Sequence, residues 1–195
     1  MTIGEKALAQ LIEGNRRFAD SKPERPRQTT ARREEIASGQ KPFAVVIGCS
    51  DSRVPPEILF DCGLGDLFVI RVAGNIVDKI VMGSVEYAVE HVGVRLVVVL
   101  GHSHCGAVTA TVEGGEALGS IGALAEIIQP AVAAVDANDD AVVDKAAMIN
   151  VRLMVGQLHD SDPILKKYMG EDHLKIVGAF YDLKSGRVEI IDSPV

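Results

Sequence analysis

Tryptophan is absent from the sequence, aromatic residues make up only 4% of its 195 residues, and there are only three cysteines. An odd number of cysteines indicates no disulfide framework, so the thiols are free for metal binding or chemistry, as in a reducing cytoplasm. Long apolar runs are also missing, and Leu96–Leu100 is far too short to cross a bilayer. The first residues, Met1–Glu5, lack the basic and apolar regions of a signal peptide. We therefore expect a cytoplasmic protein without a membrane partner.

No long basic run is present either, and the formal net charge is −7. This charge argues against nucleic acids and anionic membrane surfaces as the main partners, because both attract basic proteins. Apolar residues make up 47% of the chain, which argues against a disordered protein. The length suits a single domain with enough core to fold without disulfide bonds.

The first part of the chain has the pattern of a helical arm. Thr2 and Glu5 have the spacing of a capping box, and apolar residues then recur at helical spacing, which predicts an amphipathic helix over 3–20. A polar connector follows at 21–30, and a short helix is expected at 30–38. The first helix has little sequence after it to fold back on, so its apolar stripe lacks an evident surface within the chain.

Short continuous apolar runs come next, and such runs are typical of parallel strands that are buried on both faces. The predicted strands are Phe43–Ile47, Leu67–Val72 and Leu96–Leu100. Helices are predicted between and after these strands, at about 55–61, 80–92, 120–135 and 140–159. This alternation favours an α/β fold with right-handed crossovers.

The C-terminal part has the pattern of a β-hairpin. Strand Leu174–Tyr181, a turn at Lys184–Gly186 and strand Val188–Ile191 place one antiparallel strand at the edge of the sheet. The expected fold is therefore α/β, with a mostly parallel central sheet, flanking helices and one antiparallel edge strand. We expect a single domain overall, with a helical arm at 1–38 and the chemistry in the α/β part at 39–195.

Two of the predicted strands end in reactive side chains. Cys49 follows the first strand, and His102 and Cys105 follow the third. Ligands of an open parallel sheet bind beyond the carboxyl ends of the strands, so these side chains face one crevice if the two strands are neighbours. Two thiolates and one imidazole are good zinc ligands, and three protein ligands leave the fourth tetrahedral position open, as in catalytic sites.

Other kinds of site are less consistent with the motifs. Gly101–Gly106 has the glycine spacing of a phosphate-binding loop, but Ala107 and Val108 follow it where such a loop has Lys and Ser or Thr. The sequence has neither a G-x-G-x-x-G nor a C-x-x-C motif, which disfavours dinucleotide binding and thioredoxin-like chemistry. Cys62 has no partner at metal-binding spacing, and we interpret it as a packed or free thiol.

Four segments are similar to the conserved segments of one known family. Cys49–Pro55 and Gly101–Gly106 look like its two signature segments. Phe68–Asn75 resembles its second-strand segment, and Val85–Val89 resembles the helix that follows. Together these segments resemble the β-class carbonic anhydrases, and the similarity extends over about 40–108.

The resemblance implies both a metal site and a reaction. It implies that Cys49, His102 and Cys105 hold one zinc ion per chain, whose hydroxide attacks carbon dioxide to give bicarbonate. It also implies a hydrogen-bonded pair beside the metal, in which Arg53 fixes the Asp51 carboxylate and keeps it ionised. Within the family the first helix embraces a second subunit, so a homodimer or a multiple of dimers, such as a homotetramer, is implied.

The resemblance favours the plant-like subclass. The other subclass has a tryptophan at the position of Val46, in a regulatory bicarbonate site with the arginine that matches Arg71. Valine at this position argues against that regulatory site. In the plant-like subclass a glutamine donates its amide to the substrate, and a tyrosine can come from the neighbouring subunit. The residues implied to bind the substrate are Gln40, Phe68, Ala73, Tyr87 and Gly106.

Regenerating the hydroxide requires a proton to leave, and histidine is the usual carrier because it titrates near neutral pH. His104 lies inside the predicted metal loop, and His91 ends the helix that contains Tyr87. Either side chain can serve as a proton shuttle, and we take His104 as the candidate.

Two other functions remain open from the sequence. Relatives that hydrolyse carbonyl sulfide or carbon disulfide share these zinc ligands, so the metal motif does not exclude such a hydrolase. A non-catalytic, zinc-stabilised module needs a fourth protein ligand. Asp51 is available for that position, but Arg53 then loses its catalytic partner.

Overall fold

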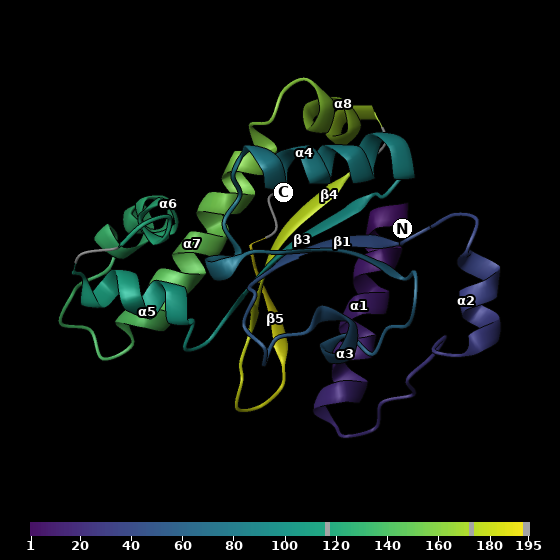
Figure 1. Cartoon of the computed structure of the whole chain (residues 1–195), viewed down its shortest axis with the longest axis horizontal. Coiled ribbons are helices and arrows are strands. Elements are labelled where there is room, and N and C mark those ends of the chain that lie inside the picture. The colour runs from purple at the N-terminus through teal and green to yellow at the C-terminus, as the bar shows by residue number, and fades with distance from the viewer. Residues whose placement is uncertain (116–117, 172–173, 193–195) are drawn as a thin grey trace.

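A five-stranded sheet in the order β2-β1-β3-β4-β5 runs through the computed structural model, which describes residues 1–115, 118–171 and 174–192 (Figure 1). The strands are β1 (Ala44–Gly48), β2 (Leu67–Arg71), β3 (Leu96–His102), β4 (Lys175–Tyr181) and β5 (Val188–Asp192). The first four strands are parallel to one another, and β5 pairs antiparallel with β4 at the edge. The predicted fold class and its antiparallel edge strand are therefore confirmed.

The central strands β1 and β3 are buried along their whole length. Alternate side chains point to opposite faces of a strand, so each strand supplies both cores. Val45 and Val97 belong to the core on one face, while Val46 and Val98 belong to the core on the other. A strand with both faces covered needs apolar residues at every position, which explains the continuous runs in the sequence.

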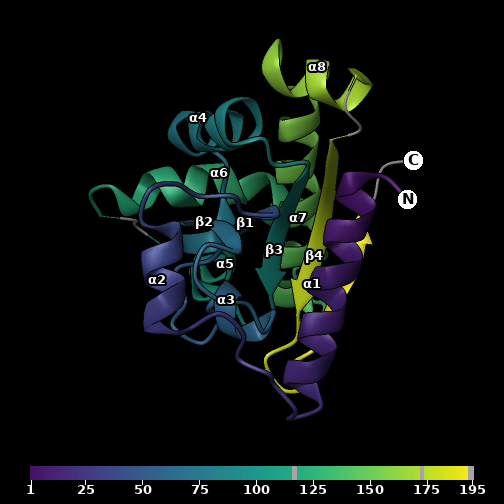
Figure 2. The same ribbon diagram turned by 90° about the vertical axis from the view of Figure 1, so that its right-hand side faces the viewer.

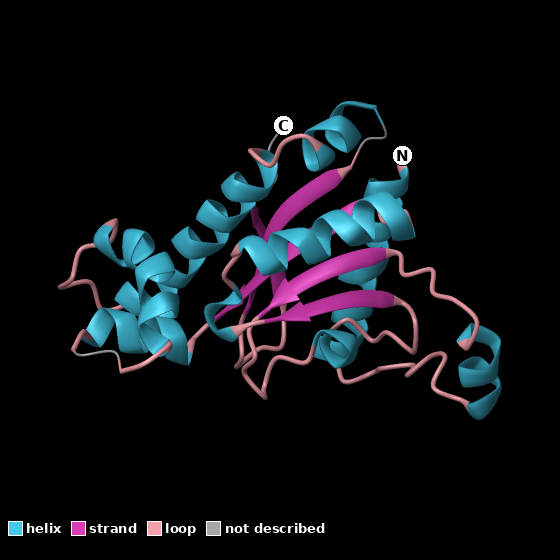
Figure 3. Ribbon diagram, turned by 45° about the horizontal axis from the view of Figure 1, so that its top comes forward, coloured by secondary structure: helices cyan, strands magenta, loops and turns pink. Residues whose placement is uncertain are grey.

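The helices lie on both faces of the sheet (Figure 3). They are α1 (Ile3–Ala19), α2 (Thr30–Ile36), α3 (Pro56–Leu59), α4 (Lys79–Tyr87), α5 (Gly106–Glu113), α6 (Ile121–Ala133), α7 (Val142–His159) and α8 (Ile164–Glu171). A short 3-10 turn, η1 (Ala73–Asn75), follows β2, and a π-helical turn, η2 (Ala88–Val92), extends α4. Helices α4 to α8 cover one face, and α1 and α3 cover the other.

Two of these helices, α5 and α8, are missing from the sequence-based prediction. Helix α5 is short and contains valine and threonine, whose branched side chains lower helix propensity. Its packing against α6 and α7 stabilises it instead. Helix α8 is equally short and places Leu165 in the core beneath it. Both helices depend on tertiary contacts that the local pattern does not reveal.

Helix α1 packs against the sheet of its own chain (Figure 2). Ala7 and Leu11 lie in the core formed with β1 and β3. Asn15 is buried, and its amide donates to the carbonyl oxygens of Leu59 at 3.0 Å and Gly186 at 2.9 Å. The expectation that this helix lacks a surface within the chain is therefore wrong, because the sheet face it covers is assembled from distant segments.

The connector after α1 is fixed by two buried carboxylates. Asp61 accepts hydrogen bonds from Arg17 at 2.7 Å and from the backbone N–H groups of Glu24 and Arg25. Burial acts to raise the pKa of Asp61, but these hydrogen bonds outweigh it and the pKa is lowered. Asp66 pairs with Arg27 in the same way, with two oxygens accepting from the guanidinium.

Among the residues that the structure describes, no helix has both the length and the apolar composition needed to cross a membrane.

The packing of α1 leads to a stability prediction. Leu11→Ala should lower the free energy of unfolding by about 2–5 kcal/mol, because it leaves a cavity in the core. Ile3→Ala, on the exposed side of the same helix, should change it by less than about 0.5 kcal/mol. Urea denaturation of both variants measures the difference, and equal stability of the two proteins would contradict this packing.

Candidate metal centre

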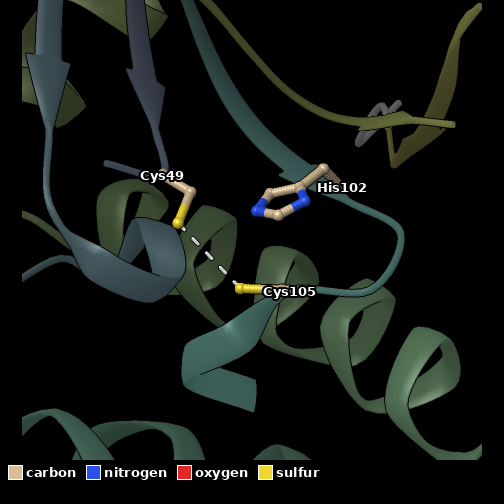
Figure 4. Close-up of side chains that lie close together, drawn as sticks. All are labelled: Cys49, His102 and Cys105. Atoms are coloured by element: carbon tan, nitrogen blue, oxygen red, sulfur yellow. Dashed lines mark hydrogen bonds between the residues drawn. The ribbon is translucent and has the colours of Figure 1, made fainter. Parts of the chain in front are cut away.

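Three potential metal ligands meet at the carboxyl ends of two neighbouring strands (Figure 4). Cys49 directly follows β1, and His102 is the last residue of β3. Strands β1 and β3 are paired in parallel, with Gly48 opposite Leu100, so both side chains emerge at the same edge of the sheet. Cys105 caps the amino end of α5 after a tight loop. The condition set by the sequence, that these strands are neighbours, is fulfilled.

The geometry of the three donor atoms fits a tetrahedral zinc ion. The donor atoms all lie within 4.8 Å of one another, and the two sulfurs are 4.0 Å apart. Two sulfurs bound to one tetrahedral zinc at about 2.3 Å would lie about 3.8 Å apart. All three side chains are buried. A buried set of two thiols and an imidazole at this spacing is suited to a metal of zinc's softness.

His102 has one ring nitrogen directed to the donor set and no partner for it. Its Nδ1 lies 2.9 Å from the carbonyl oxygen of Ser103. A carbonyl oxygen only accepts, so Nδ1 carries the proton and Nε2 carries the lone pair. Nε2 is buried without a hydrogen-bond partner among the described residues. An imidazole held by a backbone carbonyl with its other nitrogen free is the arrangement found in metal-binding histidines.

The sulfur of Cys49 is prepared to carry negative charge. Hydrogen bonds, chiefly from the Cys105 thiol and also from the Gly74 N–H at 3.3 Å, lower the pKa of Cys49 to about 4. The Cys49 thiolate in turn raises the pKa of Cys105. Metal binding requires both sulfurs to be deprotonated, and a cation between them would offset their mutual repulsion.

Asp51 lies beside the donor set and is clamped by Arg53. The Arg53 guanidinium donates to the two carboxylate oxygens at 3.0 and 2.7 Å, and the Arg53 N–H donates at 2.9 Å. These contacts, chiefly the guanidinium hydrogen bonds, lower the pKa of Asp51 to about 2. One carboxylate oxygen is 3.9 Å from Nε2 of His102. The predicted pair of Asp51 and Arg53 is thus present next to the candidate ligands.

Two further residues hold the loops of the site, and the sequence motifs did not predict this role for either of them. Arg71, at the end of β2, donates to the carbonyl oxygens of Cys49 at 2.9 Å and Asp51 at 2.5 Å. Asp144, on α7, accepts from the N–H of His104 at 2.8 Å. The signal for Arg71 was a charge at the end of an otherwise apolar strand. Asp144 lies 40 residues from its partner, and nothing local indicates the contact.

His104 is exposed and has a left-handed backbone, with φ of 51°. This conformation is strained for a residue with a side chain. Its N–H is held by Asp144, and its carbonyl oxygen accepts from Arg53 at 3.2 Å. The same arginine therefore clamps Asp51 and fixes the loop between His102 and Cys105.

Three of the predicted substrate-binding residues lie away from the ligands within this chain. Gln40 is exposed in the loop that precedes β1, whereas Cys49 follows it, so roughly 16 Å of strand separates them. Phe68 lies near the amino end of β2, with its ring centroid 6.4 Å from that of Tyr87. The ring of Tyr87 is in turn 5.3 Å from that of His91. The fold of one chain does not bring these residues to the metal ligands.

Ala73 and Gly106 lie close to the ligands. Gly106 follows Cys105 at the start of α5, and Ala73 precedes the glycine that contacts Cys49. Ala73 also lines a cavity of about 540 Å³ between α5 and α6 whose walls are mostly alanine, leucine and isoleucine. None of the three candidate ligands lines this cavity, so the cavity does not contain the donor set. It adjoins the donor set through Ala73.

Comparison with known proteins identifies the class to which this fold and site belong. A β-carbonic anhydrase of the fungus Sordaria macrospora, described as tetrameric, superimposes with a TM-score of 0.76 at 27% identity, over 95% of this chain and 97% of that one. The Coccomyxa β-carbonic anhydrase, solved with acetazolamide, gives a TM-score of 0.77 at 28% identity, over 96% and 87% of the two chains.

Sequence comparison gives the same family. The family model described as carbonic anhydrase matches residues 44–188. Carbonic anhydrase 2 of Mycobacterium tuberculosis is 40% identical over 95% of this chain and 92% of its own length. The carbonic anhydrase of Mycolicibacterium smegmatis is 41% identical over 94% and 91% of the two chains. The chain therefore belongs to the β-carbonic anhydrase family, as the sequence motifs predicted.

The donor geometry leads to a prediction about metal content. Purified protein should contain one zinc per chain, and Cys49→Ser or His102→Ala should lose most of it, because each removes one of three ligands. Cys62→Ser is the matched control, since burial raises the pKa of this thiol to about 12 and keeps it protonated. Elemental analysis measures zinc per chain. Full zinc content in both ligand variants would contradict the assignment.

Proposed function

We propose that this protein catalyses the reversible hydration of carbon dioxide to bicarbonate and a proton, with zinc held by Cys49, His102 and Cys105. The observation that carries the proposal is the buried donor set, in which Nε2 of His102 has no partner within the described part of the chain, beside a carboxylate clamped by arginine. When bound, zinc supplies the Lewis acidity that makes a water molecule nucleophilic near neutral pH. The free thiols of the site suit a reducing compartment, and we assign the protein to the cytoplasm.

Asp51 orients the nucleophile in this proposal. Because its pKa is lowered to about 2, the carboxylate is ionised at every physiological pH and acts only as a hydrogen-bond acceptor. It accepts a hydrogen bond from the nucleophilic oxygen, which turns a lone pair of that oxygen toward the carbon of the substrate. Orientation of this kind lowers the activation free energy without any proton transfer to Asp51.

Arg53 keeps Asp51 in its orienting role. An unclamped carboxylate near the donor set would itself be a good zinc ligand and would close the fourth position. The bidentate contact occupies both carboxylate oxygens and directs them to the guanidinium. This pairing also counts against a non-catalytic zinc module, in which Asp51 would serve as the fourth ligand.

We further propose that Gln40, Phe68 and Tyr87 complete the site of a neighbouring subunit, as the resemblance to the plant-like subclass implies for Tyr87. Within one chain they lie toward the opposite ends of the strands from the ligands. Gln40 and Tyr87 are exposed, and Tyr87 retains 50% of its surface, which leaves both free to contact a second copy. The tetrameric relative from Sordaria macrospora supports a homo-oligomer. Carbon dioxide would then sit between the Gln40 amide and the apolar side chain of Ala73.

His104 is our candidate for proton export. Its side chain is exposed, and its backbone is fixed directly between His102 and Cys105. Imidazole accepts and releases protons near neutral pH, so it can pass a proton from the site to buffer. At Gly106, next to Cys105, no described residue lies within 4 Å of the position where a side chain would project, which leaves room for substrate there.

The pH dependence of the reaction tests the role of Asp51. Two thiolate ligands offset the charge of zinc, so the water should be less acidic than in a three-histidine site and activity should rise from pH 7 to 9. Asp51 is ionised across this range, because its pKa is lowered to about 2, and contributes no inflection. Asp51→Ala and Arg53→Ala should each lower kcat/KM by roughly 10- to 1000-fold.

Stopped-flow measurement of carbon dioxide hydration checks these values, with Asp144→Asn as a control that retains an oxygen to accept from His104. A flat wild-type profile, or unchanged activity of Asp51→Ala, would show that the mechanism is wrong even if zinc is bound.

Shared sites between subunits lead to a complementation experiment. Gln40→Ala and Cys49→Ser should each be poorly active alone. Mixed oligomers of the two variants contain one site with all of its wild-type residues if Gln40 acts on the neighbouring subunit, so activity should exceed that of either parent. The proteins are refolded together and assayed, and sedimentation confirms the oligomer. If mixing gives no gain, Gln40 does not act across an interface.

A further inference from the structure

Asn150, on the buried side of α7, forms a hydrogen bond with the turn η1. The same turn forms a hydrogen bond with Cys49. Only 1% of its surface is exposed, and its Nδ2 donates to the carbonyl oxygen of Gly74 at 2.9 Å. The N–H of the same glycine donates to the sulfur of Cys49 at 3.3 Å. A continuous chain of hydrogen bonds therefore runs from the amide of α7 through one residue of η1 to a candidate metal ligand.

Gly74 is suited to transmit this constraint. Its φ is +72°, a left-handed value that favours glycine, and a Cβ at this position would lie 2.7 Å from Ile128. Only the two backbone dihedral angles of Gly74 separate its N–H from its carbonyl group. Fixing the carbonyl group against Asn150 therefore restricts the direction in which the N–H points.

The surroundings of the Asn150 amide show that this side chain lowers the stability of the folded protein. Its Oδ1 and the Nδ2 of Asn75, which follows Gly74 in the chain, are both buried without a hydrogen-bond partner among the described residues. A buried polar atom without a partner destabilises a folded protein, whereas an apolar side chain of similar size avoids this cost. An asparagine that forms one hydrogen bond and leaves an acceptor unpaired is better explained by what that one bond positions than by stability.

We propose that Asn150 is a positioning residue for the metal site. It fixes Gly74, so that the Gly74 N–H is aimed at the sulfur of Cys49 and holds that sulfur in line with His102 and Cys105. The inference rests on the proposed zinc site. Residues that orient metal ligands in this way typically contribute roughly 10- to 100-fold to metal affinity.

The test compares zinc affinity with stability in Asn150→Leu and Asn150→Ala. Both variants should raise the zinc dissociation constant, measured by competition with a chelator, by roughly 10- to 100-fold. The thermal midpoint of metal-free Asn150→Leu should change little, because removal of the unpaired Oδ1 of Asn150 balances the loss of the donor to the Gly74 carbonyl oxygen. In cobalt-substituted protein the thiolate-to-cobalt absorption band should shift, since one sulfur has lost a hydrogen-bond donor.

Leu158→Ala is the matched control on the same helix. Leu158 is fully buried but lies two turns away, so this variant should lose stability and keep both the zinc affinity and the cobalt spectrum of the wild type. Wild-type affinity and spectrum in both Asn150 variants would overturn the proposal, as would failure of both to fold. A wild-type protein that binds no zinc would instead contradict the proposed function.

Discussion

Parallel pairing of β1 with β3 is the constraint on which the site depends. It places the residues at the carboxyl ends of two separate strands at one edge of the sheet, so Cys49 and His102 become neighbours although their numbers differ by 53. The pairing is stable because both strands are covered on both faces and β3 contains no polar side chain before His102, its last residue. The polar, reactive residues begin only where the strands end, and the apolar core and the metal centre are thus consecutive parts of the same segments.

Because the donor atoms are buried, the protein must also control the charge of these side chains and the directions in which they point. Thiols, imidazole and carboxylate must be held at fixed angles without forming wrong contacts among themselves. Two arginines meet this need from the exposed side, where Arg53 holds the carboxylate and Arg71 holds the backbone of the loop that carries it. Helix α7 adds two further contacts: Asp144 holds the loop of His104, and the buried Asn150 holds the turn of Gly74. The ligands are therefore supported from both sides.

Much of this architecture was predictable from the sequence, and the exceptions share one cause. Continuous apolar runs revealed the parallel strands, and cysteine and histidine at two strand ends revealed the donor set, because these signals are local. Helix α1 was predicted, but its surface was not, since the face it covers comes from segments far along the chain. Asp144 and Asn150 act on partners 40 and 76 residues away, and such contacts leave no mark on neighbouring residues. Pairing between distant segments was the information that the local pattern lacked.

The position of α7 in the chain has a consequence for biogenesis. A ribosome releases Cys49, His102 and Cys105 before it releases the helix that steadies their loops, because α7 begins at Val142. Pairing of β3 with β4 also joins segments that are far apart, and such non-local contacts form slowly. An emerging chain thus exposes two thiols and an imidazole before their scaffold exists. Cells that make this protein should need to keep the two thiols reduced, and all three side chains away from competing soft metal ions, until α7 and β4 have emerged.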